Sequence, residues 1–76
     1  MIERPLDLLN ESKGSKVLVY CKGDKKYSGK VLAFDIHINL VVENMKEISE
    51  EGEVIKSFGL SFIRGDNINF ISPGEK

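Results

Sequence analysis

Two short stretches hold the polar side chains whose types and spacing suit chemistry. They are Asp35, His37 and Asn39 in the sequence FDIHINL, and Arg64, Gly65 and Asp66 in the sequence IRGDN. An acid two residues from the chain's single histidine first suggests an acid–base pair, because alternation along a strand places both on one face. No nucleophile, metal-ligand cluster or phosphate-binding loop stands near them in the sequence. We therefore expect a binding site and no catalytic one.

Size and composition limit what can position these side chains. The chain has 76 residues, enough for one small domain whose core is marginal by itself. One cysteine, Cys21, cannot form an internal disulfide, and one cysteine with one histidine is too few for a zinc site. We expect no metal or other cofactor, a buried apolar role for Cys21, and self-association as the additional support.

The charge balance excludes bulk attraction to polyanions. Eleven basic and twelve acidic residues give a formal net charge of −1, so any nucleic-acid binding requires locally concentrated positive groups. No apolar run approaches the roughly 20 residues of a membrane span, and no signal-peptide core follows the first residues. These features predict a soluble cytoplasmic domain without membrane contact.

Hydrophobic periodicity predicts an all-β domain with a short N-terminal helix, covering residues 1–76 as a single unit. Pro5 suits the first position of a helix over about residues 5–12, with Gly14 as a stop. Five strands are expected at residues 16–21, 26–35, 38–48, 54–63 and 68–72, followed by a frayed tail at 73–76.

Glycines indicate how these strands turn and bend. Gly23 and Asp24 suit the positive φ angles of a hairpin turn. Gly29 and Gly59 lie inside predicted strands, where a glycine marks a bulge, a sharp bend or a close backbone approach. Strongly bent strands curl a small sheet into a barrel, so we expect a five-stranded, strongly bent small barrel.

The last strands are rich in apolar residues near an expected sheet edge. Edge strands invite pairing with another copy of the chain. The residues in question are Leu60, Phe62, Ile68 and Phe70. They form a hydrophobic seam between subunits or fill the barrel, and the two roles are compatible.

Taken together, two motifs resemble those of the Sm and Sm-like (LSm) RNA-binding proteins, of archaeal type. The first Sm motif, a glycine-containing strand followed by Gly-Phe-Asp, two residues, Met-Asn-Leu and a hydrophobic pair, resembles YSGKVLAFDIHINLVVENMKEI. The second, Ile-Arg-Gly-Asp or -Asn before a short strand, resembles FIRGDNINFI. Ala33 stands where the family often has glycine, and Ile38 where it often has methionine; neither removes a polar contact.

This resemblance implies a ring, usually of seven and sometimes of six copies, that binds U-rich single-stranded RNA without catalysis. In such a ring the strand at 54–63 pairs with the neighbour's strand at 68–72. The loops around residues 35–39 and 64–67 face the central pore and bind one base per subunit, preferably uracil. The implied roles are RNA chaperone or ribonucleoprotein assembly platform in RNA processing, with RNA-processing proteins as further partners.

The residue types agree with that implication. Asn39 offers both a donor and an acceptor to the edge of uracil. His37 and Arg64 are flat groups that stack on a splayed base. The predicted RNA-binding set is therefore His37, Asn39, Arg64, Gly65 and Asp66, with Asp35 in support. Asp35 and Asp66 are expected to accept hydrogen bonds within the loops, and Gly65 to permit a tight turn close to the base.

Other residues leave alternatives open. Lys22, Lys25 and Lys26 are either a solvated hairpin or phosphate contacts, and Arg4 is a candidate for a second RNA contact. Tyr27 and Phe34 are expected in the core or at an interface. The alternative function is a small-barrel ring that acts as a protein-interaction scaffold without RNA binding, suggested by the acidic loop at residues 49–53.

Overall fold

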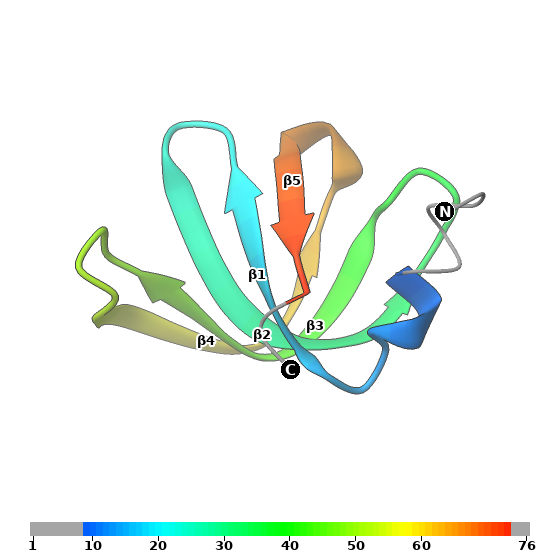
Figure 1. Cartoon of the computed structure of the whole chain (residues 1–76), viewed down its shortest axis with the longest axis horizontal. Helices are drawn as coiled ribbons and strands as arrows, with labels where there is room; N and C mark the ends of the chain where they lie inside the picture. Colours follow the sequence, from blue (N-terminus) through cyan, green and yellow to red (C-terminus); the bar gives the residue numbers. More distant parts are fainter. Residues whose placement is uncertain (1–8, 74–76) are drawn as a thin grey trace.

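The computed structural model describes residues 9–73, which form five β-strands and one 3₁₀ turn (Figure 1). In chain order these are β1 (Lys16–Cys21), β2 (Lys25–Phe34), β3 (Leu40–Ile48), β4 (Val54–Ile63), η1 (Gly65–Asn67, the 3₁₀ turn) and β5 (Ile68–Ser72). All neighbouring strands are antiparallel, in the order β4-β3-β2-β1-β5. The predicted all-β fold with five strands is confirmed.

The N-terminal helix can be compared with its prediction only in part. Residues 9–11 are helical, whereas residues 5–8 of the predicted helix and 74–76 of the predicted tail lie outside the described residues. Leu9 is buried, and the backbone N–H of Gly14 donates to the carbonyl oxygen of Val31 at 2.8 Å. The end of the helical segment is therefore fastened to β2. No helix within residues 9–73 is long and apolar enough to cross a membrane.

Alternate residues of β1 face the core, as the period of two predicted. Val17, Val19 and Cys21 are buried, and burial raises the pKa of the Cys21 thiol. They pack in one cluster with residues from the helical segment and from β2, β3 and β4: Leu9, Val31, Leu40, Val42, Met45 and Ile63. Cys21 thus occupies the buried apolar position that was expected.

Two predicted strand boundaries are wrong around residues 35–39. β2 ends at Phe34 and β3 begins at Leu40, whereas the sequence predicted strands over 26–35 and 38–48. Ile38 has a φ of 62°, a left-handed conformation that cannot continue an extended strand. The alternating pattern of FDIHINL therefore spans a loop between two strands.

The hairpin between β1 and β2 follows its prediction. Cys21 pairs with Lys25, so the loop has three residues, Lys22, Gly23 and Asp24. Gly23 and Asp24 have φ angles of 77° and 60°, the positive values that the sequence predicted for this turn.

Close approach at Gly29 bends the sheet. A Cβ atom at this position would overlap the side chain of Val42 on β3, which is 1% exposed. The register of β2 against β3 shifts at this point. Asn44 and Gly59 take positive φ angles of 59° and 78° on the next two strands. Figure 1 shows β2, β3 and β4 curving together at this level.

The curvature rolls the sheet into an open barrel. β4 and β5 are the two edge strands, and no pairing joins them within the part of the chain that the structure describes. The predicted small barrel is therefore present as a strongly bent sheet, and each edge keeps backbone groups free for another strand.

The bend at Gly29 yields a stability prediction. Gly29→Ala places a methyl group against the buried, branched side chain of Val42, and we expect the free energy of unfolding to fall by about 1–3 kcal/mol. Urea denaturation followed by circular dichroism measures the loss. In a Val42→Ala background the same substitution should cost less, because the overlapping γ-methyl is gone. An equal loss in both backgrounds contradicts the close contact.

Candidate functional site

Two loops, residues 35–39 and 64–67, meet at one end of the sheet. Leu40 at the start of β3 pairs with Ile63 at the end of β4, so the loops that adjoin these residues are neighbours. In Figure 1 they lie at the upper right, between β2 and β3 and between β4 and β5. The backbone N–H of Gly65 donates to Oδ1 of Asn39 at 2.7 Å. This hydrogen bond joins the two predicted motifs, which are 26 residues apart.

Asp35 organises the first loop. Its Oδ1 accepts the backbone N–H groups of His37 at 2.8 Å and Asn39 at 3.1 Å. Its Oδ2 accepts Nδ2 of Asn39 at 2.9 Å. A carboxylate that takes three donors of its own loop replaces the ladder bonds that a strand would have supplied. Asp35 therefore supports the loop and fixes the Asn39 side chain.

The same donors stabilise the ionised form of Asp35. The side-chain hydrogen bond from Asn39 is the largest cause that holds the pKa of this carboxyl below its ordinary value of 3.8, and the backbone hydrogen bonds add to it. Asp35 is an acceptor-only carboxylate at neutral pH.

Asn39 is held in one orientation. Its Oδ1 faces an N–H that can only donate, and its Nδ2 faces a carboxylate that can only accept. Reversing the amide would break both hydrogen bonds, so the network itself assigns the two atoms. One lone pair on Oδ1 and one hydrogen on Nδ2 remain for another group. The loop thus presents an acceptor and a donor side by side in a fixed order.

Gly65 is required for the contact between the loops. A Cβ atom there would overlap the carbonyl oxygen of His37 and come within 3.2 Å of the Ile38 carbonyl carbon. From the sequence, Gly65 was expected to permit a tight turn and a close approach of the chain to a base. The structure shows close approach to the backbone of the first loop, and Gly65 begins the 3₁₀ turn η1.

His37 and Arg64 stand exposed in the two loops. Among residues 9–73 the His37 side chain forms no hydrogen bond or ion pair, although its backbone N–H donates to Asp35. Arg64 pairs with Asp66 at 3.3 Å, with side chains 71% and 81% exposed. An ion pair so exposed to water contributes little to the free energy of folding. Both flat groups are therefore available to an incoming ligand, and Asp66 acts on Arg64 as expected.

Two of the three lysines of the β1–β2 hairpin, Lys25 and Lys26, contact side chains outside the two loops. Lys25 pairs with Glu47 at 3.3 Å, and Nζ of Lys26 lies 5.6 Å from the centre of the Tyr20 ring. Lys22 is exposed, and its backbone N–H donates to the Asn67 carbonyl oxygen at 2.8 Å. Asn67 thus links the second loop to this hairpin, a role that the sequence analysis missed. Arg4 lies outside the described residues.

The two aromatic residues flanking the site belong to the packing, as expected. Tyr27 and Phe34 are partly buried against the core. The Tyr27 ring stands edge-on to Phe58 with centroids 6.1 Å apart. Residues 9–73 contain no group of three or more histidine, cysteine or acidic side chains suited to a metal ion.

Comparisons with known proteins agree with this fold and with the two motifs. The family model described as LSM domain matches residues 7–73. The Sm protein of Pyrococcus abyssii in complex with a uridine heptamer is 42% identical, with a TM-score of 0.87, covering 95% of this chain and 100% of that one. The SmAP (LSm) protein of Methanococcus vannielii is 40% identical, with a TM-score of 0.80 and coverage of 92% and 94%. The SmAP1 heptamer of P. aerophilum is 33% identical, with a TM-score of 0.89 and full coverage of both chains.

The Asp35–Asn39 contact yields a titration prediction. Because the Asn39 side chain is the main cause of the lowered pKa, Asn39→Ala should move the Asp35 titration midpoint up toward its ordinary value. The carboxyl carbon shift of Asp35, followed by NMR as a function of pH, measures both midpoints.

The lowered pKa of Asp35 also predicts how the stability of the fold depends on pH. A lowered pKa in the folded state contributes stability above pH 3.8, and this contribution is lost as the pH falls through the lower folded value. Asn39→Ala should weaken that acid dependence. Identical midpoints in the two proteins would show that the amide does not hold the carboxylate.

Proposed function

The chain belongs to the LSM-domain family of Sm-like proteins, and on that premise we propose that it is a non-catalytic ring protein that binds U-rich single-stranded RNA. Each subunit is one domain over residues 1–76 and receives one base. The proposed base-binding residues are His37, Asn39, Arg64, Gly65 and Asp66, with Asp35 in support. A uridine heptamer bound to a similar protein supports the ligand class.

The observation that carries the proposal is the fixed amide of Asn39. Uracil presents an N–H donor at N3 beside a carbonyl acceptor at O4. The free lone pair on Oδ1 and the free hydrogen on Nδ2 match that order. Cytosine presents an acceptor at N3 and an amino donor at N4. In the same position its N3 would face the acceptor Oδ1 and its amino group would face the donor Nδ2, so neither hydrogen bond could form. Because the amide cannot reverse without losing two hydrogen bonds, it favours uracil.

Stacking supplies the remainder of the contact. A splayed base offers two flat faces, and His37 and Arg64 come to it from different loops. Such stacking is worth about 1–3 kcal/mol per base and does not depend on base identity. Gly65 and Asp66 contribute indirectly, since Gly65 holds Asn39 and Asp66 pairs with Arg64.

The free edges of the sheet support ring assembly. Within residues 9–73, β4 pairs only with β3 and β5 only with β1, so each has one free edge. Pairing β4 of one copy with β5 of the next continues the sheet without leaving an edge. Leu60, Phe62 and Phe70, which lie on these strands, are 70%, 67% and 56% exposed. Burying them between copies would remove exposed apolar surface from water.

Repetition around a ring strengthens the site. The heptameric P. aerophilum relative favours seven copies, with six as the alternative closure. A strand of RNA that fills several sites gains from effective concentration. The ring also gathers one Arg64 per subunit, so positive charge is concentrated although the chain carries a net charge of −1.

The biological role that follows is an RNA chaperone or a platform for ribonucleoprotein assembly, with RNA-processing proteins as further partners. We place it in the cytoplasm, because its one cysteine, Cys21, is unpaired and buried, which suits a reducing compartment.

Base preference tests the proposal. Fluorescence anisotropy at one fixed salt concentration should show uridine heptamer bound more tightly than cytidine heptamer, by about 1–3 kcal/mol for each base that is read. His37→Ala should weaken uridine binding by at least about tenfold through lost stacking. His37→Phe, which keeps a flat ring, should retain most of the affinity.

Two results would contradict this account. Equal binding of the two heptamers by the wild type would remove uracil recognition. Absence of RNA binding with an intact oligomer would favour the alternative function, a protein-interaction scaffold.

Ring assembly makes a separate prediction. Light scattering should give a mass of six or seven times the 8.5 kDa chain. Phe62→Glu places a charge in each proposed interface and should shift the mass toward smaller species. Leu32→Glu is the control, because Leu32 is 40% exposed on β2, away from both edges. A wild-type monomer, or equal effects of the two substitutions, would argue against the β4–β5 seam.

A further inference from the structure

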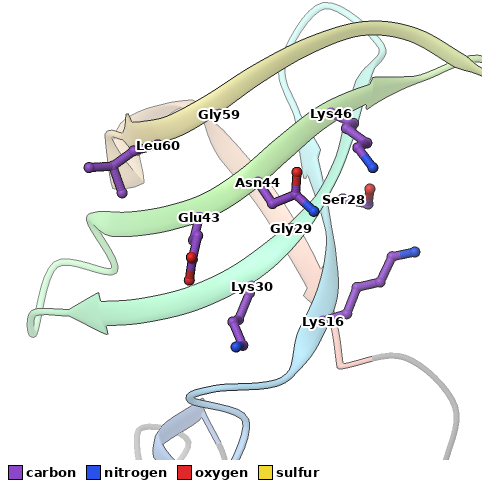
Figure 2. A pocket seen from close by; sticks show the side chains of 9 residues that line it. All are labelled: Lys16, Ser28, Gly29, Lys30, Glu43, Asn44, Lys46, Gly59 and Leu60. Atoms are coloured by element: carbon purple, nitrogen blue, oxygen red, sulfur yellow. The ribbon is translucent and has the colours of Figure 1, made fainter.

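A cavity of about 650 Å³ lies at the sheet bends, outside the two loops of the candidate site (Figure 2). It is lined by β1, β2, β3 and β4 around Gly29, and Leu60 bounds it toward the β4 edge. In Figure 1 the bends of β2 and β3 lie at the bottom, whereas the loops at residues 35–39 and 64–67 lie near the top. This cavity is therefore separate from the uracil site.

Three lysines line this cavity, and strand register brings them together. Lys16 on β1 stands directly across from Lys30 on β2. Lys46 on β3 stands across from Ser28, two residues before Lys30. Figure 2 shows the side chains of Lys16, Lys30 and Lys46 projecting from three neighbouring strands, and all three line the cavity. The sequence gives no sign of this cluster, because its members are 14 and 16 positions apart and meet only through strand pairing.

Within residues 9–73, none of the three lysines forms an ion pair. Like charges directly opposite on neighbouring strands destabilise a sheet. Glu43, across from Lys30, also lines the cavity, yet no carboxylate in residues 9–73 comes within ion-pair distance of Lys16, Lys30 or Lys46. Three lysines against one glutamate leave a positive excess, which an external anion would relieve.

The chemistry of the lining points to phosphate. Lysine ammonium groups bind phosphate as point charges, and the Asn44 amide and Ser28 hydroxyl add hydrogen-bond donors. No aromatic side chain lines the cavity, so bases have nothing to stack on. A site of this kind contacts the sugar–phosphate backbone and carries no sequence information.

We propose that the cavity formed by Lys16, Lys30 and Lys46 is a second RNA site, which holds backbone phosphates of the strand that continues beyond the uracil sites. The choice of RNA rests on the proposed function, because the loops bring this polyanion to the protein. Since the cavity lies beside the β4 edge, each subunit boundary of the ring would carry one such site.

A tailed RNA tests the inference with the full chain. Anisotropy compares a uridine heptamer with the same heptamer extended by a cytidine tail of about 15 nucleotides. The tail should increase wild-type affinity roughly tenfold at low salt. Lys30→Gln/Lys46→Gln should abolish most of this gain and leave binding of the untailed heptamer unchanged. For this variant and the tailed RNA, the slope of log affinity against log salt concentration should become shallower by about 0.7 for each removed lysine that contacts a phosphate.

Matched variants separate the cavity from general charge. Lys13→Gln/Lys56→Gln removes the same charge from exposed positions outside the cavity and should keep the tail gain. Glu43→Gln removes the opposing charge and should increase the gain, a result that misfolding cannot produce.

The outcomes distinguish the two proposals. Wild-type protein that fails to bind the uridine heptamer overturns the proposed function and this inference with it. Heptamer binding without a tail gain, or an equal loss in both double variants, overturns this inference alone. An aspartate-rich peptide that binds wild type but not Lys30→Gln/Lys46→Gln, with the tail gain unaffected, assigns the cavity to acidic protein segments and also overturns it.

Discussion

The hydrogen bond from the Gly65 backbone N–H to Oδ1 of Asn39, 2.7 Å long, is the contact on which the site depends. It joins loops from the two motifs and decides which end of the amide faces outward. Asp35 fixes the other end by accepting Nδ2 at 2.9 Å. Any side chain at position 65 would collide with the His37 carbonyl, so this contact demands glycine. Base preference in the proposed function follows from these few contacts.

The bent sheet is what brings the loops together and leaves the edges free. Close approach at Gly29 and positive φ angles at Asn44 and Gly59 curve β2, β3 and β4 at one level. The loops at residues 35–39 and 64–67 then lie side by side, while the outer edges of β4 and β5 have no partner strand within residues 9–73. The same bend of the sheet thus positions both the edges of the proposed ring and the loops of the proposed pore site. The same bends form the lysine-lined cavity.

Local patterns predicted the fold well, because period-two alternation and glycine positions are properties of single segments. The Gly23–Asp24 turn and the bend at Gly29 follow from local chemistry of this kind. Alternation failed at FDIHINL, where Ile38 turns left-handed and Asp35 caps the loop from within. The candidate residues came from motif resemblance, and the sequence missed what depends on register: the contact of Gly65 with His37 and the grouping of Lys16, Lys30 and Lys46.

A crystal structure of the chain bound to a uridine heptamer tests the central claim most directly. The account predicts that N3–H of uracil donates to Oδ1 of Asn39 and that Nδ2 donates to O4. The hydrogen bonds to Gly65 and Asp35 should persist, and His37 and Arg64 should contact the two faces of the base. A uracil read by other groups, or an Asn39 amide released from Gly65 and reversed, would contradict it.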